Sequence, residues 1–125
     1  MWGMRLEDFK ILITGSRHHE NRRMIEKAIL DEVGVLSPEN VTIIHGNARG
    51  ADLISDSIAR EHNFNISSHS AKWDLFGKMA GNIRNQKMVD LEPDICLAFP
   101  LDNSIGTYDC IRRAKEAGIE TKVFR

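Results

Sequence analysis

The sequence predicts a single-domain α/β protein, a Rossmann-like parallel sheet with helices on both faces. Short apolar runs alternate along the chain with amphipathic stretches of helical periodicity, which is the pattern of βαβ units. The length of 125 residues provides for one hydrophobic core but not for two. No repeat or linker interrupts the alternation. With right-handed crossovers, we expect the strand order 3-2-1-4-5.

Five segments are expected to be strands because each is a short run bounded by glycine, proline or polar residues. The first is continuously apolar and ends at Gly15, as a strand buried on both faces does. The third run is weaker than the others. The predicted strands are residues 10–14, 41–45, 65–70, 94–99 and 121–124.

Four stretches carry apolar residues at helical spacing. Gly34 and then Pro38 end the first, the third is a helix despite Gly81, and Gly118 caps the fourth. The predicted helices are residues 20–33, 50–61, 78–91 and 107–117. The least regular segment, residues 67–77, is expected to lie over one end of the sheet. Residues 1–8 are expected to form a loosely held tail, so that the domain spans residues 9–125.

The composition excludes several classes of protein. A hydrophobic fraction of 42% and a charged fraction of 28% are ordinary for a globular chain, not for a disordered or collagen-like one. Seventeen Lys and Arg against eighteen Asp and Glu lack the basic excess of proteins that act mainly on duplex nucleic acid. No apolar run approaches the roughly 18 residues of a membrane span, and no signal peptide is recognised. We therefore expect a cytoplasmic protein without a membrane partner, with Cys96 and Cys110 as reduced core residues.

The chemistry is expected beyond the carboxyl ends of the strands, where ligands bind in doubly wound sheets. Three strand-to-helix turns combine glycine with small polar residues, and the predicted order makes their strands neighbours. Each turn opens a helix whose first N–H groups and dipole favour an anion. Glycine lets a phosphate approach the backbone, while hydroxyl and guanidinium groups donate hydrogen bonds to it. The predicted phosphate-binding residues of these turns are Gly15, Ser16, Arg17, Gly46, Arg49, Gly50, Ala51, Asp52, Ser104, Gly106 and Thr107.

A simpler interpretation of each turn is that glycine only permits tight geometry and that serine or aspartate caps a helix. Three such turns on one face favour a phosphate-bearing ligand instead. Both the GxGxxG fingerprint and the P-loop are absent. The histidines show no metal-binding spacing, so no metal site is expected, and no Gly-x-Ser-x-Gly elbow supports a serine hydrolase. His45, at a strand end, is expected to be partly buried and hydrogen-bonded.

The third predicted helix and the segment before it leave two alternatives open. Lys78, Arg84 and Asn85 lie on a similar face and are either solvated residues or further ligand contacts. Trp73 and Phe76 either close a small core or stack on a base.

One string of motifs extends over nearly the whole chain, from about residue 10 to residue 125. It consists of Gly15-Ser16-Arg17, His45-Gly46, Arg49-Gly50-Ala51-Asp52, Trp73, Gly77-Lys78-x-Ala80-Gly81-x-x-Arg84-Asn85-x-x-Met88, Asp94, Ala98-Phe99-Pro100, Gly106-Thr107, Ala114 and Gly118. The string resembles the YspA/cpYpsA-related branch of the SLOG superfamily of Rossmann-like domains. The resemblance implies a parallel sheet with its site where the three turns converge.

Relatives in that superfamily include the Lonely Guy enzymes, which remove adenine from ribose 5′-monophosphate, a DNA-processing protein of DNA uptake, and sensors of nucleotide signals made from NAD. Arg84 stands where the Lonely Guy enzymes have a catalytic arginine. Their catalytic glutamate position holds Cys110, and Asp109 lies one residue earlier, about 100° around the helix. Glycosidic cleavage needs a carboxylate at the sugar face, so the departure favours binding over hydrolysis. Arg84 and Asp109 remain the catalytic candidates.

The leading hypothesis is a binding module for a nucleotide or nucleotide-derived ligand, such as ADP-ribose or a nucleoside phosphate, that needs no other cofactor. It would act as a sensor or accessory protein. A nucleoside 5′-monophosphate phosphoribohydrolase and a single-stranded DNA-binding protein are the alternatives, and the balanced charge argues against the second. The resemblance also implies a dimer or higher oligomer. Met79, Ile83 and Met88 either contribute to its interface or face the sheet.

Overall fold

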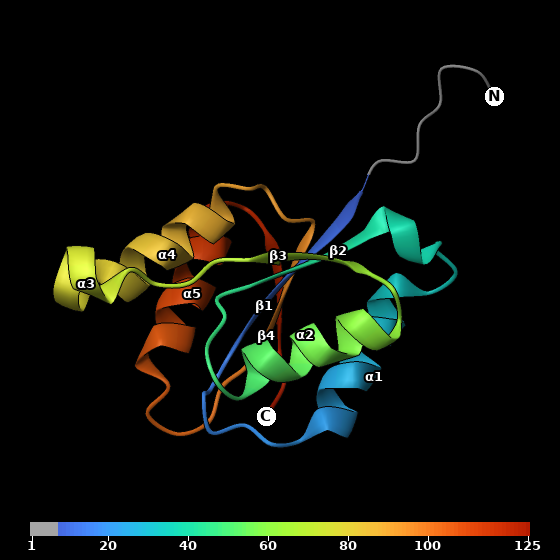
Figure 1. Cartoon of the computed structure of the whole chain (residues 1–125), viewed down its shortest axis with the longest axis horizontal. Coiled ribbons are helices and arrows are strands. Elements are labelled where there is room, and N and C mark those ends of the chain that lie inside the picture. Colours follow the sequence, from blue (N-terminus) through green and yellow to red (C-terminus); the bar gives the residue numbers. More distant parts are fainter. Residues whose placement is uncertain (1–7) are drawn as a thin grey trace, which may run out of the picture.

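The computed structural model describes residues 8–125, and its centre is a five-stranded sheet in which all strands are parallel. The order β3-β2-β1-β4-β5 confirms the prediction (Figure 1). The strands are β1 (Phe9–Gly15), β2 (Val41–His45), β3 (Asn65–Ser68), β4 (Ile95–Phe99) and β5 (Glu120–Val123). The expected tail, residues 1–8, lies outside the described residues except for its last one.

Helices cover both faces of the sheet, as predicted (Figure 1). On one face lie α1 (Arg22–Val33) and α2 (Ala51–Glu61), and on the other lie α4 (Ala80–Val89) and α5 (Ile105–Glu116). Three short elements complete the chain: the 3₁₀ turns η1 (Pro38–Asn40) and η2 (Gly77–Met79), and the single-turn helix α3 (Trp73–Phe76). None of the helices within residues 8–125 is long and apolar enough to cross a membrane.

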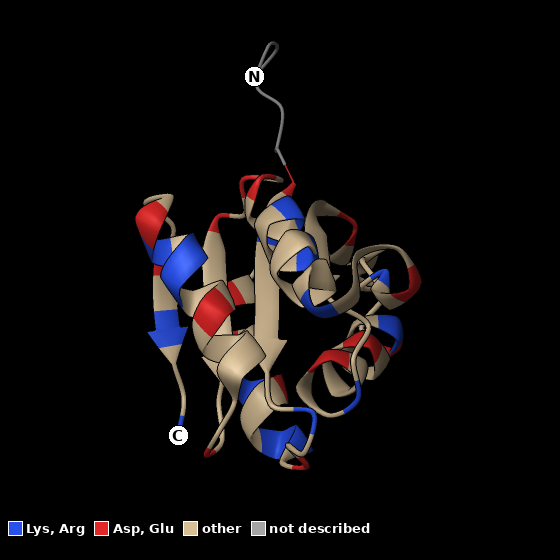
Figure 2. Cartoon of the chain, turned by 90° about the vertical axis from the view of Figure 1, so that its left-hand side faces the viewer, with Lys and Arg blue, Asp and Glu red and all other residues tan. Residues whose placement is uncertain are grey.

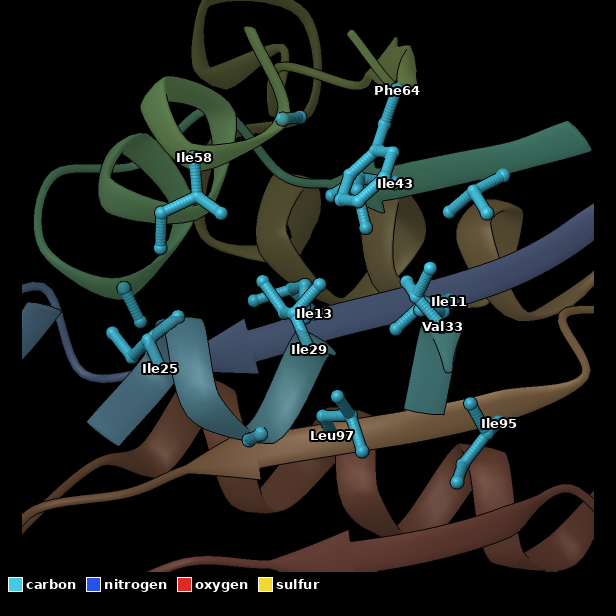
Figure 3. Packing of buried hydrophobic residues seen from close by; sticks show 14 of the residues in the cluster. Ile11, Ile13, Ile25, Ile29, Val33, Ile43, Ile58, Phe64, Ile95 and Leu97 are labelled. Carbon is cyan, nitrogen blue, oxygen red and sulfur yellow. The ribbon is translucent and has the colours of Figure 1, made fainter. Parts of the chain in front are cut away.

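The central strand β1 contributes to two hydrophobic cores. Ile11 and Ile13 face α1 and α2, in the cluster that Figure 3 shows, while Leu12 faces α4 and α5. All three side chains are fully buried, because successive residues of a strand point to opposite faces and both faces are covered. This explains why β1 is continuously apolar in the sequence.

Both cysteines belong to the core on the α4–α5 face, as the sequence predicts. Cys96 of β4 and Cys110 of α5 are fully buried and form no disulfide. The interaction with Cys110 and burial both raise the pKa of Cys96. Position 110, for which the resemblance implied a glutamate in the Lonely Guy enzymes, is therefore part of the hydrophobic core in this chain.

The segment before α4 differs from the prediction. Residues 73–76 form α3, which lies beside α4 instead of covering an end of the sheet (Figure 1). Trp73 is 59% exposed and Phe76 is 45% exposed, so they do not close a small core. The predicted helix 78–91 begins only at Ala80, because Gly77 adopts φ +54° after α3 and the turn η2 follows. Lys78 consequently lies on η2 and not on α4.

Candidate functional site

The turn that follows β1 is joined by backbone hydrogen bonds to two other segments at the carboxyl ends of the strands. The N–H of Ser16 donates to the carbonyl of Phe99, at the end of β4, over 3.0 Å. The carbonyl of Ser16 accepts from the N–H of Ala51, at the start of α2, over 3.1 Å. The sheet order thus brings the predicted turns together at the end of the sheet to which the strand arrows point. Figure 2 shows several Lys and Arg residues at this end.

Close packing explains why two of these turns carry glycine. A Cβ atom at Gly15 would lie 2.5 Å from the Cβ of Ala51. Gly50 has φ +76°, and a Cβ there would lie 2.3 Å from the carbonyl oxygen of Ser16. Both distances are far below van der Waals contact, so only glycine lets the turns approach each other so closely. At these two positions the simple tight-turn interpretation accounts for the residue.

Gly106 is different because a Cβ at this position would meet no atom within 4 Å. The residue is exposed in the first turn of α5. The side chain of Ser104, the residue before α5, makes no cap to this helix and instead accepts the N–H of Leu101 over 2.9 Å. The first N–H groups of α5 are therefore free of a side-chain cap, while Thr107 is buried.

A cavity of about 590 Å³ lies between the start of α1 and α2, and we call it the α1–α2 groove. Arg17 from the turn after β1 and Arg49 from the turn after β2 both line it, together with Arg22 of α1. Arg22 pairs with Glu61 over 2.5 Å. Within residues 8–125, Arg17 and Arg49 take part in no ion pair. Glu20 also lines the groove but, in this part of the chain, forms no ion pair with either arginine, so two unpaired guanidinium groups and one carboxylate face the same cavity.

Arg84 of α4 lies against the turn after β2. Its Nη1 donates to the carbonyl of Gly46 over 2.6 Å, and its Nε donates to Oδ1 of Asn85 over 2.9 Å. A Cβ at Gly46 would lie 2.4 Å from that Nη1, so the glycine makes room for the guanidinium. Arg84 does not line the α1–α2 groove, so the predicted set of arginines is divided between two places.

Asn85 and Asp109 join α4 to α5. Nδ2 of the buried Asn85 donates to the carbonyl of Gly106 and to Oδ2 of Asp109, each over 3.1 Å. Asp109 also accepts from Arg113 over 2.8 Å and from Arg112 over 2.9 Å. Although burial acts in the opposite direction, the hydrogen bonds from Arg113 and Asn85 hold the pKa of Asp109 below its usual value. Both carboxylate oxygens of this catalytic candidate are thus engaged in helix packing.

Asp52 is a buried carboxyl group in the first turn of α2. Its Oδ2 accepts the N–H groups of Gly46 over 3.1 Å and of Ala48 over 3.2 Å, so it caps the turn after β2 and not a helix. Oδ1 is buried without a hydrogen-bond partner within residues 8–125. Burial raises the pKa of Asp52 to about 6, although nearby His45 and Arg84 oppose the shift.

His45 and Asp56 form a pair that sequence reasoning did not find. The Nδ1 of His45 accepts the N–H of Asn47 over 2.9 Å, so Nε2 carries the proton and donates to Asp56 over 2.7 Å. His45 is fully buried, more deeply than predicted, and is hydrogen-bonded as predicted. Asp56 follows His45 by 11 residues and lies in the middle of α2. No local spacing in the sequence marks the two as partners.

The remaining predicted residues are more scattered. Ser16 is buried, and its hydroxyl accepts the N–H of His18 over 3.0 Å, which stabilises the turn after β1. Ala51 is buried beneath Gly15. Lys78 is exposed on η2 and lines neither the α1–α2 groove nor the cavity beside Arg84. His18 and His19, which the sequence analysis did not select, line the groove.

Comparison with known proteins gives similarities in sequence and in fold. The chain is 45% identical over 115 residues to a Mycobacterium phage D29 protein described as Gene 61 protein, covering 88% of this chain and 91% of that protein. The fold is similar to that of DNA processing protein A from Streptococcus pneumoniae, with a TM-score of 0.73 and 17% identity. That match covers 94% of this chain but 50% of the other, so this chain spans half the length of that structure.

The sequence of residues 9–76 matches the family described as YspA, cpYpsA-related SLOG family. These residues contain β1 and β2, with both turns that carry Arg17 and Arg49. The matched part therefore includes the strand ends that form the α1–α2 groove. The resemblance inferred from the motifs is confirmed, and the chain belongs to the YspA, cpYpsA-related SLOG family.

Proposed function

We propose that this protein binds a nucleotide or nucleotide-derived ligand, of the ADP-ribose or nucleoside-phosphate kind, as a cytoplasmic sensor or accessory protein. The observation that carries the proposal is the α1–α2 groove, where Arg17 and Arg49 from two different turns face one cavity of about 590 Å³ without an ion pair in residues 8–125. Guanidinium groups bind phosphate oxygens through directed hydrogen bonds. The volume is within the range of small-molecule sites.

The start of α5 supports the same proposal. Its first N–H groups have no side-chain cap, and the backbone at Gly106 is open to solvent. An uncapped helix N-terminus attracts a second anionic group, through its N–H groups and through the dipole. The start of α5 does not line the α1–α2 groove, so it would serve as a second contact for a ligand that extends beyond the groove.

We expect ADP-ribose or ADP to raise the melting temperature of the protein. Arg49→Gln should weaken that binding by about ten- to a hundredfold, because one charge-assisted hydrogen bond is worth about 1.5–3 kcal/mol. Gly106→Val is expected to fold, since nothing within 4 Å meets its Cβ. It should reduce the thermal shift because the branched side chain covers the first N–H groups of α5. Calorimetric titration measures the affinity of Arg49→Gln, and thermal unfolding with and without ligand measures the shift of Gly106→Val.

Arg23→Gln is the matched control, because Arg23 is exposed on α1 and does not line the groove. This variant should bind like the wild type. Wild-type affinity in Arg49→Gln would refute the groove as the site. An unchanged thermal shift in Gly106→Val would remove α5 from the site.

The hydrolase alternative has a direct test. We expect wild-type protein to release no adenine from AMP above the level of an Arg84→Ala control. The reason is that Cys110 is buried in the core, and both oxygens of Asp109 are engaged by Arg112, Arg113 and Asn85. Chromatography of the nucleobase measures the outcome. Turnover that disappears in both Arg84→Ala and Asp109→Asn would favour the enzyme.

The fold shared with DNA processing protein A supports a DNA-processing role as a further alternative. The formal net charge of −1 does not favour it, because binding to phosphate backbones relies on a basic surface. A gel shift with single-stranded DNA that weakens steeply with salt would favour this alternative over a small-molecule ligand.

We also propose that the protein self-associates through α3 and α4. Met88 faces the sheet and is buried, whereas Met79 is 55% exposed and Ile83 is 41% exposed. Trp73 and Leu75 extend this apolar surface on α3, none of whose residues is buried. Light scattering should give at least the mass of a dimer, and Met79→Asp should shift it towards the monomer. A monomeric wild type at high concentration would contradict the proposal.

A further inference from the structure

A second cavity, of about 370 Å³, lies between the end of β3 and α4. We call it the β3–α4 pocket. It shares no lining residue with the α1–α2 groove. Ser68, His69 and Ser70 form one side, and residues of α4 form the other. Its volume suits a small ligand.

The charged residues of the β3–α4 pocket are all cationic. Lys72, Arg84 and Lys87 line it, and no carboxylate does. The ion pairs formed within residues 8–125 include none of the three. Three positive charges around one cavity without a counter-charge favour an anionic occupant.

The hydrogen bonds of Arg84 leave one edge of its guanidinium for such an occupant. Nε donates to Asn85 and Nη1 donates to Gly46, with a longer contact of 3.5 Å from Nη1 to the carbonyl of His69. These bonds fix the plane of the group. Within the described part of the chain, Nη2 donates to no protein acceptor. A fixed guanidinium with a free edge is well suited to a phosphate oxygen.

His69 lines the pocket beside these cations. Burial, followed by the charges of Lys87 and Arg84, lowers the pKa of His69 from its ordinary value. Its Nε2 is hydrogen-bonded with the hydroxyl of Ser67 over 2.7 Å. The lowered pKa disfavours the charged imidazolium at this place in the pocket.

The other part of the lining is apolar. Phe76 from α3 and Ile83 from α4 reach the pocket and remain 45% and 41% exposed, and Ala80 lies between them in sequence. Side chains exposed to this extent gain from contact with a flat apolar group. The pocket therefore combines an anion-binding side with an apolar side.

We propose that the β3–α4 pocket binds a phosphate monoester that carries a flat apolar group. The phosphate contacts Lys72, Lys87 and the free edge of Arg84, and the flat group packs against Phe76 and Ile83. Three cations favour a dianionic phosphate over a single carboxylate. This binding is additional to the ligand proposed for the α1–α2 groove and does not depend on it.

Phenyl phosphate is the simplest probe of this chemistry. In an NMR titration it should shift the amide signals of residues 68–70 and 83–87, whereas phenol should not. Inorganic phosphate should bind the same residues about tenfold more weakly, because it lacks the apolar contact. AMP compared with adenosine shows whether a nucleotide supplies the phosphate ester. All titrations are carried out at a protein concentration where light scattering gives each variant the same mass, so that a change in self-association does not change the signals.

Three variants decide the outcome. Lys87→Gln should weaken phenyl phosphate binding about tenfold. Phe76→Ala should weaken phenyl phosphate but leave inorganic phosphate unchanged. The matched control Lys115→Gln, at an exposed position of α5 outside the pocket, should bind like the wild type. Wild-type binding by Lys87→Gln, or the absence of saturable binding at millimolar phenyl phosphate, would overturn the proposal. Binding lost in Arg49→Gln but kept in Lys87→Gln would place the probe in the groove and leave the proposed function standing.

Discussion

Raising the pH from about 5 to about 8 is expected to lower the stability of the wild type relative to Asp52→Asn by about 1–2 kcal/mol. Burial raises the pKa of Asp52 from 3.8 to about 6, so the folded state binds this proton more tightly than the unfolded state. The resulting stabilisation is complete below pH 3.8 and is lost as the pH rises through about 6. Above that pH, folding requires a buried carboxylate whose Oδ1 has no partner within residues 8–125.

Urea unfolding of the two proteins across this pH range measures the effect. The difference between them reports Asp52 together with its interactions with His45 and Arg84, because titrating groups far from position 52 contribute equally to both. Asparagine at position 52 can still accept the N–H groups of Gly46 and Ala48 through its side-chain oxygen. Asp74→Asn, at an exposed position of α3, is the control and should give a difference from wild type that varies little with pH. If the stability difference between wild type and Asp52→Asn stays constant with pH, the pKa of Asp52 is not raised by burial and the prediction is wrong.

Gly50→Ala is expected to destabilise the protein by about 3–5 kcal/mol, whereas Gly34→Ala should cost about 1–2 kcal/mol. The two glycines have similar backbone angles, φ +76° and ψ −128° at Gly50 and φ +55° and ψ −122° at Gly34. Both substitutions therefore incur backbone strain. Only at Gly50 does a Cβ also meet backbone atoms, 2.3 Å from the carbonyl oxygen of Ser16 and 2.5 Å from the carbonyl carbon of Arg17.

The comparison of these variants separates strain from close packing. Urea denaturation at one pH gives both free energies of unfolding. The turn after β1 must move to admit the methyl group. Gly50→Ala should therefore also lower the affinity for any ligand that Arg17 and Arg49 bind. Equal losses of stability in the two variants would show that the turns are not packed as tightly as the structure indicates.

The sequence was sufficient to predict the sheet because its signals are local. The run in β1 is apolar on both faces and ends with Gly15, while Gly46 and Pro100 each follow a buried strand. The helix α3 was not predicted because its four residues are too few to show helical periodicity. Its apolar side chains are also exposed and not packed in a core. Periodicity reports burial, so it is silent where an apolar segment remains uncovered.

The candidate site was only partly predictable for a related reason. Turn composition identified Arg17 and Arg49, which the sheet order then brings to one groove. It could not show that Arg84 turns towards a different cavity, because that depends on the contact between α4 and the carbonyl of Gly46. The partnership of His45 with Asp56 and the unpartnered oxygen of Asp52 are likewise products of packing between elements.

The two edge strands of the sheet limit aggregation by strand pairing. The edge strands β3 and β5 have four residues each, and their exposed positions include Asn65 and Ser68 on one and Glu120 and Lys122 on the other. Short strands with polar and charged side chains are poor templates for further strand pairing. Growth of cross-β aggregates from the native state is therefore disfavoured at both ends of the sheet, and amyloid formation would first require the edges to unfold.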